Sequence, residues 1–340
     1  MARTFWPRRS VLVTGAGGFV GSWLADALAQ RGAQVTVILR DEPVLTNFRL
    51  LGLSTRVNVV RGSVTDATLV GRVLAEYEID TCFHLAAQAI VGIANRSPVS
   101  TFESNIHGTW SVLEACRMSK SIERVVVASS DKAYGAQPVL PYTEDMPLLG
   151  INPYDASKVC ADLIARCYAD AYKTPIAVAR CANIYGGGDL NFSRLIPGTI
   201  RSALSGERPV VRSDGTPVRD YLYIEDAVRA YLALAEHLPD GTISGRAFNF
   251  GTDSPISVRN LVRRILDVCG SSDVEPDVRG AGPPAGEIAC QYLNCDQARA
   301  ALGWTAEISL EDGLRWTASW YAKFIGAADR IAASAVGAFG

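Results

Sequence analysis

The chain has 340 residues, of which 48% are hydrophobic and 20% are charged. This balance is that of an ordinary globular protein, and it excludes a disordered or fibrous chain. Lys and Arg number 33 against 35 Asp and Glu, which gives a formal charge of −2. No strong field would therefore attract nucleic acid or an anionic membrane surface. We expect a small polar ligand, and neither nucleic acid nor membrane as a partner.

The eight cysteines are scattered singly, with no Cys-x-x-Cys pair. This pattern favours buried thiols in a reducing compartment and predicts no metal site. The apolar run that follows the charged N-terminal residues covers only Val11 to Val13, short of the ~7–15 residues of a signal sequence. No stretch reaches the ~18–20 apolar residues of a membrane helix. These features predict a soluble cytoplasmic protein.

From residue 10 to about residue 180, short apolar runs rich in β-branched residues alternate with longer segments of helical spacing. The runs lack polar alternation, which is typical of strands covered by helices on both faces. The predicted fold is therefore α/β, a Rossmann-type doubly wound parallel sheet. Its strands are expected at residues 11–14, 34–39, 57–61, 81–85, 124–129 and 176–181.

Gly15, Gly18 and Gly21 follow the first of these strands in the order Gly-x-x-Gly-x-x-Gly, just before an amphipathic run over 22–31. Glycines let the backbone approach a pyrophosphate, and the N-terminus of the following helix binds its charge. The strand and helix context is the one that this motif requires. It predicts a dinucleotide site, with Phe19 and Val20 in the turn, although a tight turn without a ligand is the alternative.

The second strand ends in Arg40 and Asp41. An acid at this point would accept from the ribose hydroxyls of NAD, whereas an arginine suits the extra phosphate of NADP; both could also be solvated loop charges. The expected cofactor is therefore NAD or NADP. Further cofactor contacts are expected where the third and fourth strands end, at Ser63, Val64, Leu85, Ala86 and Ala87.

The fifth strand is followed by Ser129-Ser-Asp-Lys-Ala-Tyr-Gly135, at the sheet edge where such folds hold ligands. Tyr154 and Lys158 come about twenty residues later and, being four apart, share one face of a predicted helix. An ammonium beside a phenol moves the phenol pKa from ~10 towards the working pH, which suits proton exchange with a sugar hydroxyl. A tyrosine lying over a lysine stem, with no chemistry, is the alternative.

After Asn183 the rhythm breaks, and glycine and proline become frequent, beginning with Gly186-Gly187-Gly188. We expect residues 1–182 to form the dinucleotide-binding domain, with segments near 216–252 returning to it. Residues 183–325 would then form mainly a smaller substrate-binding lobe, and residues 326–340, rich in Ala and Gly, a tail.

With these motifs in this order, the chain resembles the extended short-chain dehydrogenase/reductase family, the sugar-nucleotide epimerases and dehydratases, from Val11 to about Trp304. The resemblance implies a nucleotide-sugar substrate, a tightly held NAD or NADP, and a homodimer formed through helices near 105–118 and 157–172. It assigns the pyrophosphate loop to Gly15, Gly18 and Gly21, the active-site hydroxyl to Ser130, the catalytic base to Tyr154, the nicotinamide ribose to Lys158, and a position near the site to Asn105.

The second half carries further signatures of the same family. The segment Arg219-Asp-Tyr-Leu-Tyr-Ile-Glu-Asp226 matches a late motif whose arginine approaches the nucleotide phosphates. The resemblance also implies substrate contacts at Gln88, Asn183, Leu195, Ile196, Val211, Arg212 and Glu287.

Asp131 and Lys132 stand where simple 4-epimerases usually carry small or apolar residues. A 4,6-dehydratase needs two such groups, because after oxidation at C4 one must remove the C5 proton and another must protonate the departing C6 hydroxyl. Ser-Asp-Lys resembles the version found in CDP-glucose 4,6-dehydratases, and Gln88 fits dehydratases of the CDP-glucose and GDP-mannose kinds. The sequence therefore favours a sugar-nucleotide 4,6-dehydratase, with Asp131 as acid and Lys132 as base, or with the two roles exchanged.

Three alternatives stay open at this point. Asp131 and Lys132 could pair with each other as a loop ion pair. The protein could be a nucleotide-sugar 4-epimerase in which these two residues serve binding alone. It could also be a non-catalytic dinucleotide sensor or scaffold.

Overall fold

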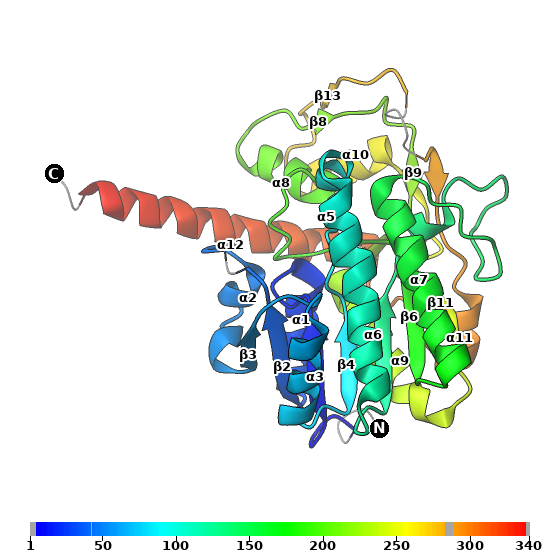
Figure 1. Ribbon diagram of the computed structural model, residues 1–340. Helices are drawn as coiled ribbons and strands as arrows, with labels where there is room; N and C mark the ends of the chain where they lie inside the picture. Colours follow the sequence, from blue (N-terminus) through cyan, green and yellow to red (C-terminus); the bar gives the residue numbers. More distant parts are fainter. Residues whose placement is uncertain (1–4, 42, 283–287, 338–340) are drawn as a thin grey trace.

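The computed structural model describes residues 5–41, 43–282 and 288–337, with side chains in the last helix described as far as Gly326. At its centre lies a parallel sheet of seven strands in the order β11-β6-β5-β4-β1-β2-β3 (Figure 1). Its strands are β1 Ser10–Thr14, β2 Gln34–Leu39, β3 Asn58–Arg61, β4 Thr81–His84, β5 Arg124–Ala128, β6 Ile176–Cys181 and β11 Ala247–Phe250. The predicted Rossmann-type sheet is confirmed, and each of the six predicted strands ends within one residue of its expected bounds.

The strands are mainly apolar, and both faces of the sheet are covered. Along β1, Val11 and Val13 belong to one core and Leu12 to the other. The first core is completed by helices α1 (Phe19–Gln30) and α9 (Ile224–His237), and the second by α3 (Ala67–Glu76), α6 (Gly108–Met118) and α7 (Pro153–Tyr172) (Figure 1). Strand order reverses between β1 and its two neighbours, β2 and β4, and ligands of doubly wound sheets bind at such a point, outside the carboxyl ends of the strands.

The helices are α1 Phe19–Gln30, α2 Asn47–Leu50, α3 Ala67–Glu76, α4 Val91–Arg96, α5 Pro98–Phe102, α6 Gly108–Met118, α7 Pro153–Tyr172, α8 Leu195–Leu204, α9 Ile224–His237, α10 Val258–Val268, α11 Asp296–Leu302 and α12 Leu310–Gly337. Short 3₁₀ turns cover Leu53–Thr55, Asp131–Tyr134 and Leu238–Asp240, and a π turn covers Glu103–His107. The first helix begins at Phe19, inside the glycine motif, rather than after it at residue 22. Helix α12 extends to Gly337, through most of the segment 326–340 that is expected to form a tail.

A smaller lobe stands over the carboxyl edge of the sheet (Figure 1). It contains α8, α10 and the pair β8 Val210–Val211 with β13 Asp277–Val278, around a core that includes Val211 and Leu266. Two further small sheets connect it to the main body, β7 Asn183–Tyr185 with β10 Tyr221–Tyr223, and β9 Val218–Arg219 with β12 Ile256–Ser257 and β14 Cys290–Gln291. These strands lie above the switch point and carry several of the predicted substrate residues.

Within the part of the chain that the structure describes, no helix has both the length and the apolar character needed to cross a bilayer. The same part contains no group of His, Cys, Asp and Glu side chains that could hold a metal ion. The eight cysteines are all free thiols.

Candidate active site

The turn between β1 and α1 leaves room for a ligand because its glycines lack side chains. Gly15 has φ +77°, and a Cβ there would lie 2.7 Å from the backbone nitrogen of Ala86. Gly18 caps α1 without a side-chain hydrogen bond, and no acidic residue lies in the first turn of the helix. The positive end of α1 thus stays available to an anion. This turn fits the pyrophosphate of a dinucleotide.

A cleft of about 1040 Å³ opens between the carboxyl edge of the sheet and the smaller lobe. Its volume is at the upper end of the range for a single ligand site, as expected where two ligands meet. The predicted residues that line it are Phe19, Val20, Leu85, Ala87, Ser130, Asp131, Lys132, Tyr154, Lys158, Asn183, Leu195, Ile196, Arg212 and Arg219. The fold therefore brings both halves of the predicted site together.

Ten other predicted residues do not line this cleft, namely Gly15, Gly18, Gly21, Arg40, Ser63, Val64, Ala86, Gln88, Asn105 and Val211. Gly15 and Gly18 belong to the turn between β1 and α1, and Gly21 lies in the first turn of α1. Val211 packs in the core of the smaller lobe, while its two neighbours, Val210 and Arg212, line the cleft. Glu287 lies outside the described residues.

Helix α7 presents Tyr154 and Lys158 to the cleft, both nine-tenths or more buried. The Lys158 ammonium donates to the backbone carbonyl of Ala128 at the end of β5, at 2.7 Å. Burial lowers the pKa of Lys158 to about 8. Burial, assisted by the charge of Asp131, raises the pKa of Tyr154 to about 12, against the effects of Ser130 and Arg194.

The predicted fall in the pKa of Tyr154 is therefore wrong for this structure. The cost of placing a phenolate in a buried position exceeds the effect of the surrounding positive charges. In addition, the Lys158 ammonium donates its hydrogen bond to the Ala128 carbonyl.

Asp131 and Lys132 stand in the 3₁₀ turn that follows β5. The Ser130 hydroxyl caps this turn by accepting from the Lys132 backbone N–H at 3.2 Å, and it donates to Asp131 Oδ1 at 3.0 Å. Asp131 is 2% exposed, and its Oδ2 has no hydrogen-bond partner among the described residues. Burial raises the pKa of Asp131 to about 6, although the charge of Lys132 opposes this.

Asn105 connects elements below the cleft. It lies in the π turn between α5 and α6, where its Oδ1 accepts from the Gln88 backbone N–H at 2.7 Å and its Nδ2 donates to Ser157 Oγ at 2.8 Å. The Gln88 side chain accepts from the Ile90 backbone N–H at 3.0 Å. Both predicted residues thus hold the loop after β4 against α7.

At the end of β2 a second cavity of about 160 Å³ lies beside the glycine turn. Asp41 lines it together with Gly17 and Leu39, whereas Arg40 does not. Arg40 is exposed, and its guanidinium pairs with the Asp41 carboxylate at 2.7 Å. The acid, not the arginine, therefore lines the small cavity beside the glycine turn.

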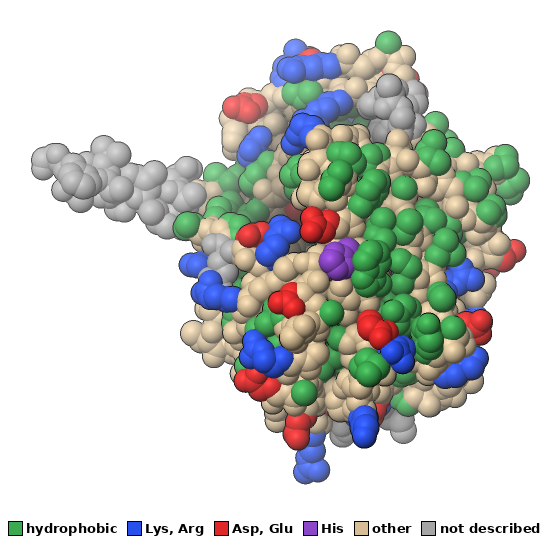
Figure 2. Space-filling model, viewed as in Figure 1, with side chains coloured by type: hydrophobic (Ala, Val, Ile, Leu, Met, Phe, Trp, Pro, Cys, Tyr) green, Lys and Arg blue, Asp and Glu red, His purple; other side chains and the backbone are tan. Residues whose placement is uncertain are grey.

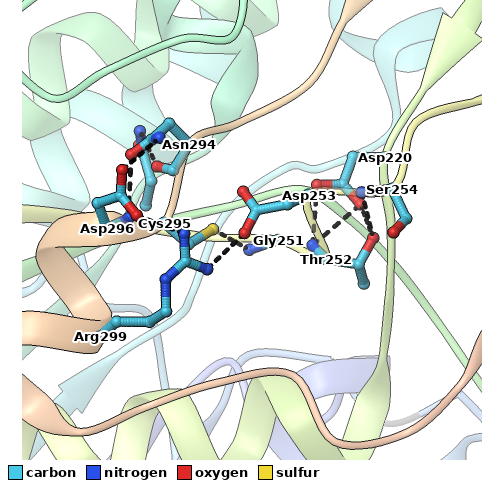
Figure 3. A network of polar contacts seen from close by, with 10 residues as sticks. Asp220, Gly251, Thr252, Asp253, Ser254, Asn294, Cys295, Asp296 and Arg299 are labelled. Atoms are coloured by element: carbon cyan, nitrogen blue, oxygen red, sulfur yellow. Dashed lines mark hydrogen bonds and ion pairs between the residues drawn. The ribbon is translucent and has the colours of Figure 1, made fainter.

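The motif at residues 219–226 is held in place by hydrogen bonds to its first acidic residue, Asp220. Asp220, fully buried, accepts from the Thr252 backbone N–H at 3.1 and 2.9 Å and from the Thr252 hydroxyl (Figure 3). The neighbouring Arg219 donates to the carbonyls of Val218 and Ala289 at 2.9 and 3.1 Å. Asp220 thus joins the smaller lobe to the loop after β11 and holds Arg219 at the cleft.

Three arginines that line the cleft were not predicted, namely Arg96, Arg194 and Arg201. Arg96 ends α4, Arg201 lies on α8, and Arg194, which precedes α8, pairs with the buried carboxylate of Asp189 at 2.8 Å. Arg194 also lowers the pKa of Tyr154. The signal that could have identified them is position, because each follows a strand that ends at the ligand-binding edge of its sheet.

The strand order and the glycine turn define a Rossmann-type dinucleotide-binding protein. Residues 11–251 match the model of the NAD dependent epimerase/dehydratase family. Among its curated relatives, CDP-glucose 4,6-dehydratase of Salmonella typhimurium is 29% identical over 346 residues, covering 98% of this chain and 96% of that protein. UDP-glucose 4-epimerase of Mycolicibacterium smegmatis is 32% identical, covering 91% of this chain and 97% of that protein.

Among solved structures, dTDP-glucose 4,6-dehydratase of Bacillus anthracis in complex with NAD superposes with a TM-score of 0.81 at 26% identity, covering 93% of this chain and 97% of that one. The chain belongs to the NAD-dependent epimerase/dehydratase family. Its cofactor is accordingly NAD, and the protein is an enzyme.

Proposed function

We propose that the protein is a sugar-nucleotide 4,6-dehydratase, which converts an NDP-hexose into an NDP-4-keto-6-deoxyhexose. The observation that carries the proposal is Asp131. Its carboxyl group is buried in the same cleft as Tyr154, has a pKa raised to about 6, and has one oxygen without a partner among the described residues. A carboxyl group in this state is suited to protonate a leaving hydroxyl.

The proposal gives each residue a separate role. Tyr154 in its phenolate form accepts the proton of the C4 hydroxyl, with Ser130 beside it, and Lys158 holds the nicotinamide ribose; the positive charge of bound NAD would favour that phenolate against the cost of burial. When bound, NAD would take up hydride from C4 and return it to C6. The 4-keto group makes the C5 proton acidic, so that Lys132 can remove it while Asp131 protonates the C6 hydroxyl, which leaves as water. Lys132 then returns the proton to C5 as hydride is delivered to C6.

The ion-pair alternative for Asp131 and Lys132 finds little support. No salt bridge joins the two side chains in the described part of the structure, and the Asp131 carboxyl is bonded to Ser130 instead. Both side chains line the cleft. They are therefore placed to act on a substrate rather than on each other.

The substrate proposed first is CDP-glucose, on the strength of the Salmonella relative and the Ser-Asp-Lys segment. The phosphates would meet Arg212 and Arg219, with Asn183, Leu195 and Ile196 along the same wall of the cleft. Relatives of both kinds, dehydratases and epimerases, match at about this level of identity, so the reaction itself needs a direct test.

The test is incubation of the purified enzyme with CDP-glucose, GDP-mannose, UDP-glucose and dTDP-glucose, followed by mass spectrometry. A product lighter by one water supports the proposal. An isobaric product identifies a 4-epimerase, and bound NAD without turnover of any of the four identifies a non-catalytic sensor or scaffold.

We also propose a homodimer. Exposed apolar side chains gather on the face formed by α5, α6 and α7 (Figure 2), including Val99, Phe102, Trp110, Met118, Leu163 and Tyr172. Light scattering coupled to gel filtration would test this, and Trp110→Glu on α6 should give a monomer.

We also propose that residues 1–182 form a dinucleotide domain and residues 183–325 a substrate lobe. A cytoplasmic location is proposed as well.

A further inference from the structure

A buried ion pair lies directly beneath the cleft. Arg180 of β6 is fully buried, and its Nε and Nη2 donate to the two carboxylate oxygens of Asp162 at 2.8 and 2.9 Å. Asp162 is also fully buried. A paired fork of this kind fixes both distance and orientation.

The acid of this pair belongs to the catalytic helix. Tyr154, Lys158 and Asp162 follow one another at intervals of four residues along α7, so they share one face of the helix. The ion pair consequently anchors that face of α7 to β6, one turn beyond Lys158.

The remaining guanidinium nitrogen of Arg180, Nη1, contacts the 3₁₀ turn that carries Asp131 and Lys132. Its Nη1 donates to the hydroxyl of Tyr134, the last residue of that turn, at 2.8 Å. The guanidinium also lies 4.9 Å from the centre of the Tyr134 ring. The Tyr134 hydroxyl in turn donates to Asn249 Oδ1 of β11 at 2.7 Å. The donors and acceptors along this path are fully matched.

Arg180 therefore connects the two elements that carry the acid and base groups. It is not among the described residues that line the cleft, so it acts through others. We propose that Arg180 is a positioning residue, which holds Asp131 and Lys132 at a fixed distance from Tyr154 and Lys158.

This inference rests on the proposed dehydratase function and makes it more specific. Oxidation at C4 depends on the residues of α7. Loss of water requires in addition that residues of the 3₁₀ turn and of α7 contact the same sugar. A small change in their mutual position should therefore slow elimination selectively, since displacement by about 1 Å can cost ~10²-fold in rate.

The test is Tyr134→Phe, which removes the hydroxyl and leaves the ring and the Arg180–Asp162 pair in place. Tyr321→Phe is the matched control, because Tyr321 of α12 is equally buried and its hydroxyl donates to the backbone carbonyl of Asp189, not to any residue of the 3₁₀ turn. In single turnovers, C4 oxidation is followed by nicotinamide absorbance and elimination by mass spectrometry of quenched samples.

For Tyr134→Phe we expect elimination to slow by ~10–100-fold while C4 oxidation stays within about threefold, so that reduced nicotinamide accumulates. Tyr321→Phe should leave both steps within about threefold. Equal loss of both steps in Tyr134→Phe, or no loss, overturns the inference. If Tyr134→Phe does not fold, Arg180→Lys takes its place, since lysine keeps the charge but cannot bind both Asp162 and Tyr134. The same selective loss of elimination is expected.

Failure of the proposed function gives a different result. A wild-type enzyme that forms only isobaric products from all four nucleotide sugars would overturn the dehydratase proposal, and the inference with it. A wild-type dehydratase whose Tyr134→Phe variant behaves like Tyr321→Phe would overturn the inference alone.

Discussion

The Ser130 hydroxyl donates to one carboxyl oxygen of Asp131 at 3.0 Å, while the other oxygen of Asp131 has no partner among the described residues. Each oxygen of this buried group thus has a separate environment. Ser130 orients the group, and the second oxygen stays free of protein contacts among the described residues. This arrangement is the basis of the acid role proposed for Asp131.

Replacement of that carboxyl group should separate the two halves of the reaction. Asp131→Asn keeps the shape but removes the transferable proton, so loss of water should slow by ~10²–10⁴-fold, while C4 oxidation continues. The measurement is formation of the dehydrated product beside nicotinamide absorbance. Asp155→Asn is the control, because Asp155 lines the same cleft and accepts from Asn152 Nδ2 at 3.0 Å. Unimpaired elimination by Asp131→Asn would contradict the assignment.

The stability of the protein should depend on pH through the same residue. Burial raises the pKa of Asp131 from 3.8 to about 6, so the folded state holds this proton more tightly than the unfolded state. The resulting stabilisation is complete below about pH 4 and is lost as the pH rises through about 6, a change on the order of 2–3 kcal/mol. Urea unfolding at pH 4 to 8 measures it. Relative to Asp131→Asn, the wild type should become less stable over this interval, and parallel curves would refute the prediction.

Tyr154 should be required for the chemistry and dispensable for folding. Tyr154→Phe removes the hydroxyl that exchanges a proton with the C4 hydroxyl, which should cost ~10²–10⁴-fold in kcat with NAD affinity unchanged. Tyr231→Phe is a suitable control, since Tyr231 is buried at the wall of the same cleft but lies on α9. Steady-state kinetics and calorimetric titration with NAD provide the two readouts. Turnover near the wild-type rate in Tyr154→Phe would remove the mechanism.

The features predicted from sequence are those set by local patterns. Examples are the apolar runs at β1 and β2, the glycine turn, and the spacing of Tyr154 and Lys158. Each of these features lies within a short stretch of sequence, where the periodicity of the residues indicates the structure. The Arg180–Asp162 pair was missed because its members belong to different elements, and nothing in either segment identifies the other. The direction of the Tyr154 pKa shift was wrong for a similar reason, because burial depends on the whole fold.

The glycine turn should be required both for the stability of the protein and for NAD binding. Gly15→Ala places a Cβ 2.7 Å from the Ala86 backbone nitrogen, on a residue with φ +77°. Both effects are unfavourable, since strain at such a φ alone costs about 1–3 kcal/mol. The variant should unfold at a lower temperature and bind NAD at least ~10-fold more weakly, because the turn that approaches the pyrophosphate must move.

Gly71→Ala in α3 is the matched control, as a Cβ there meets nothing within 4 Å. Alanine in the middle of a helix should instead stabilise the protein by about 0.5–1 kcal/mol, with NAD affinity unchanged. Differential scanning calorimetry and NAD titration of the two variants separate strain at the turn from a general effect of adding a methyl group. Equal behaviour of the two variants would show that the close approach of Gly15 to the loop after β4 does not shape the cofactor site.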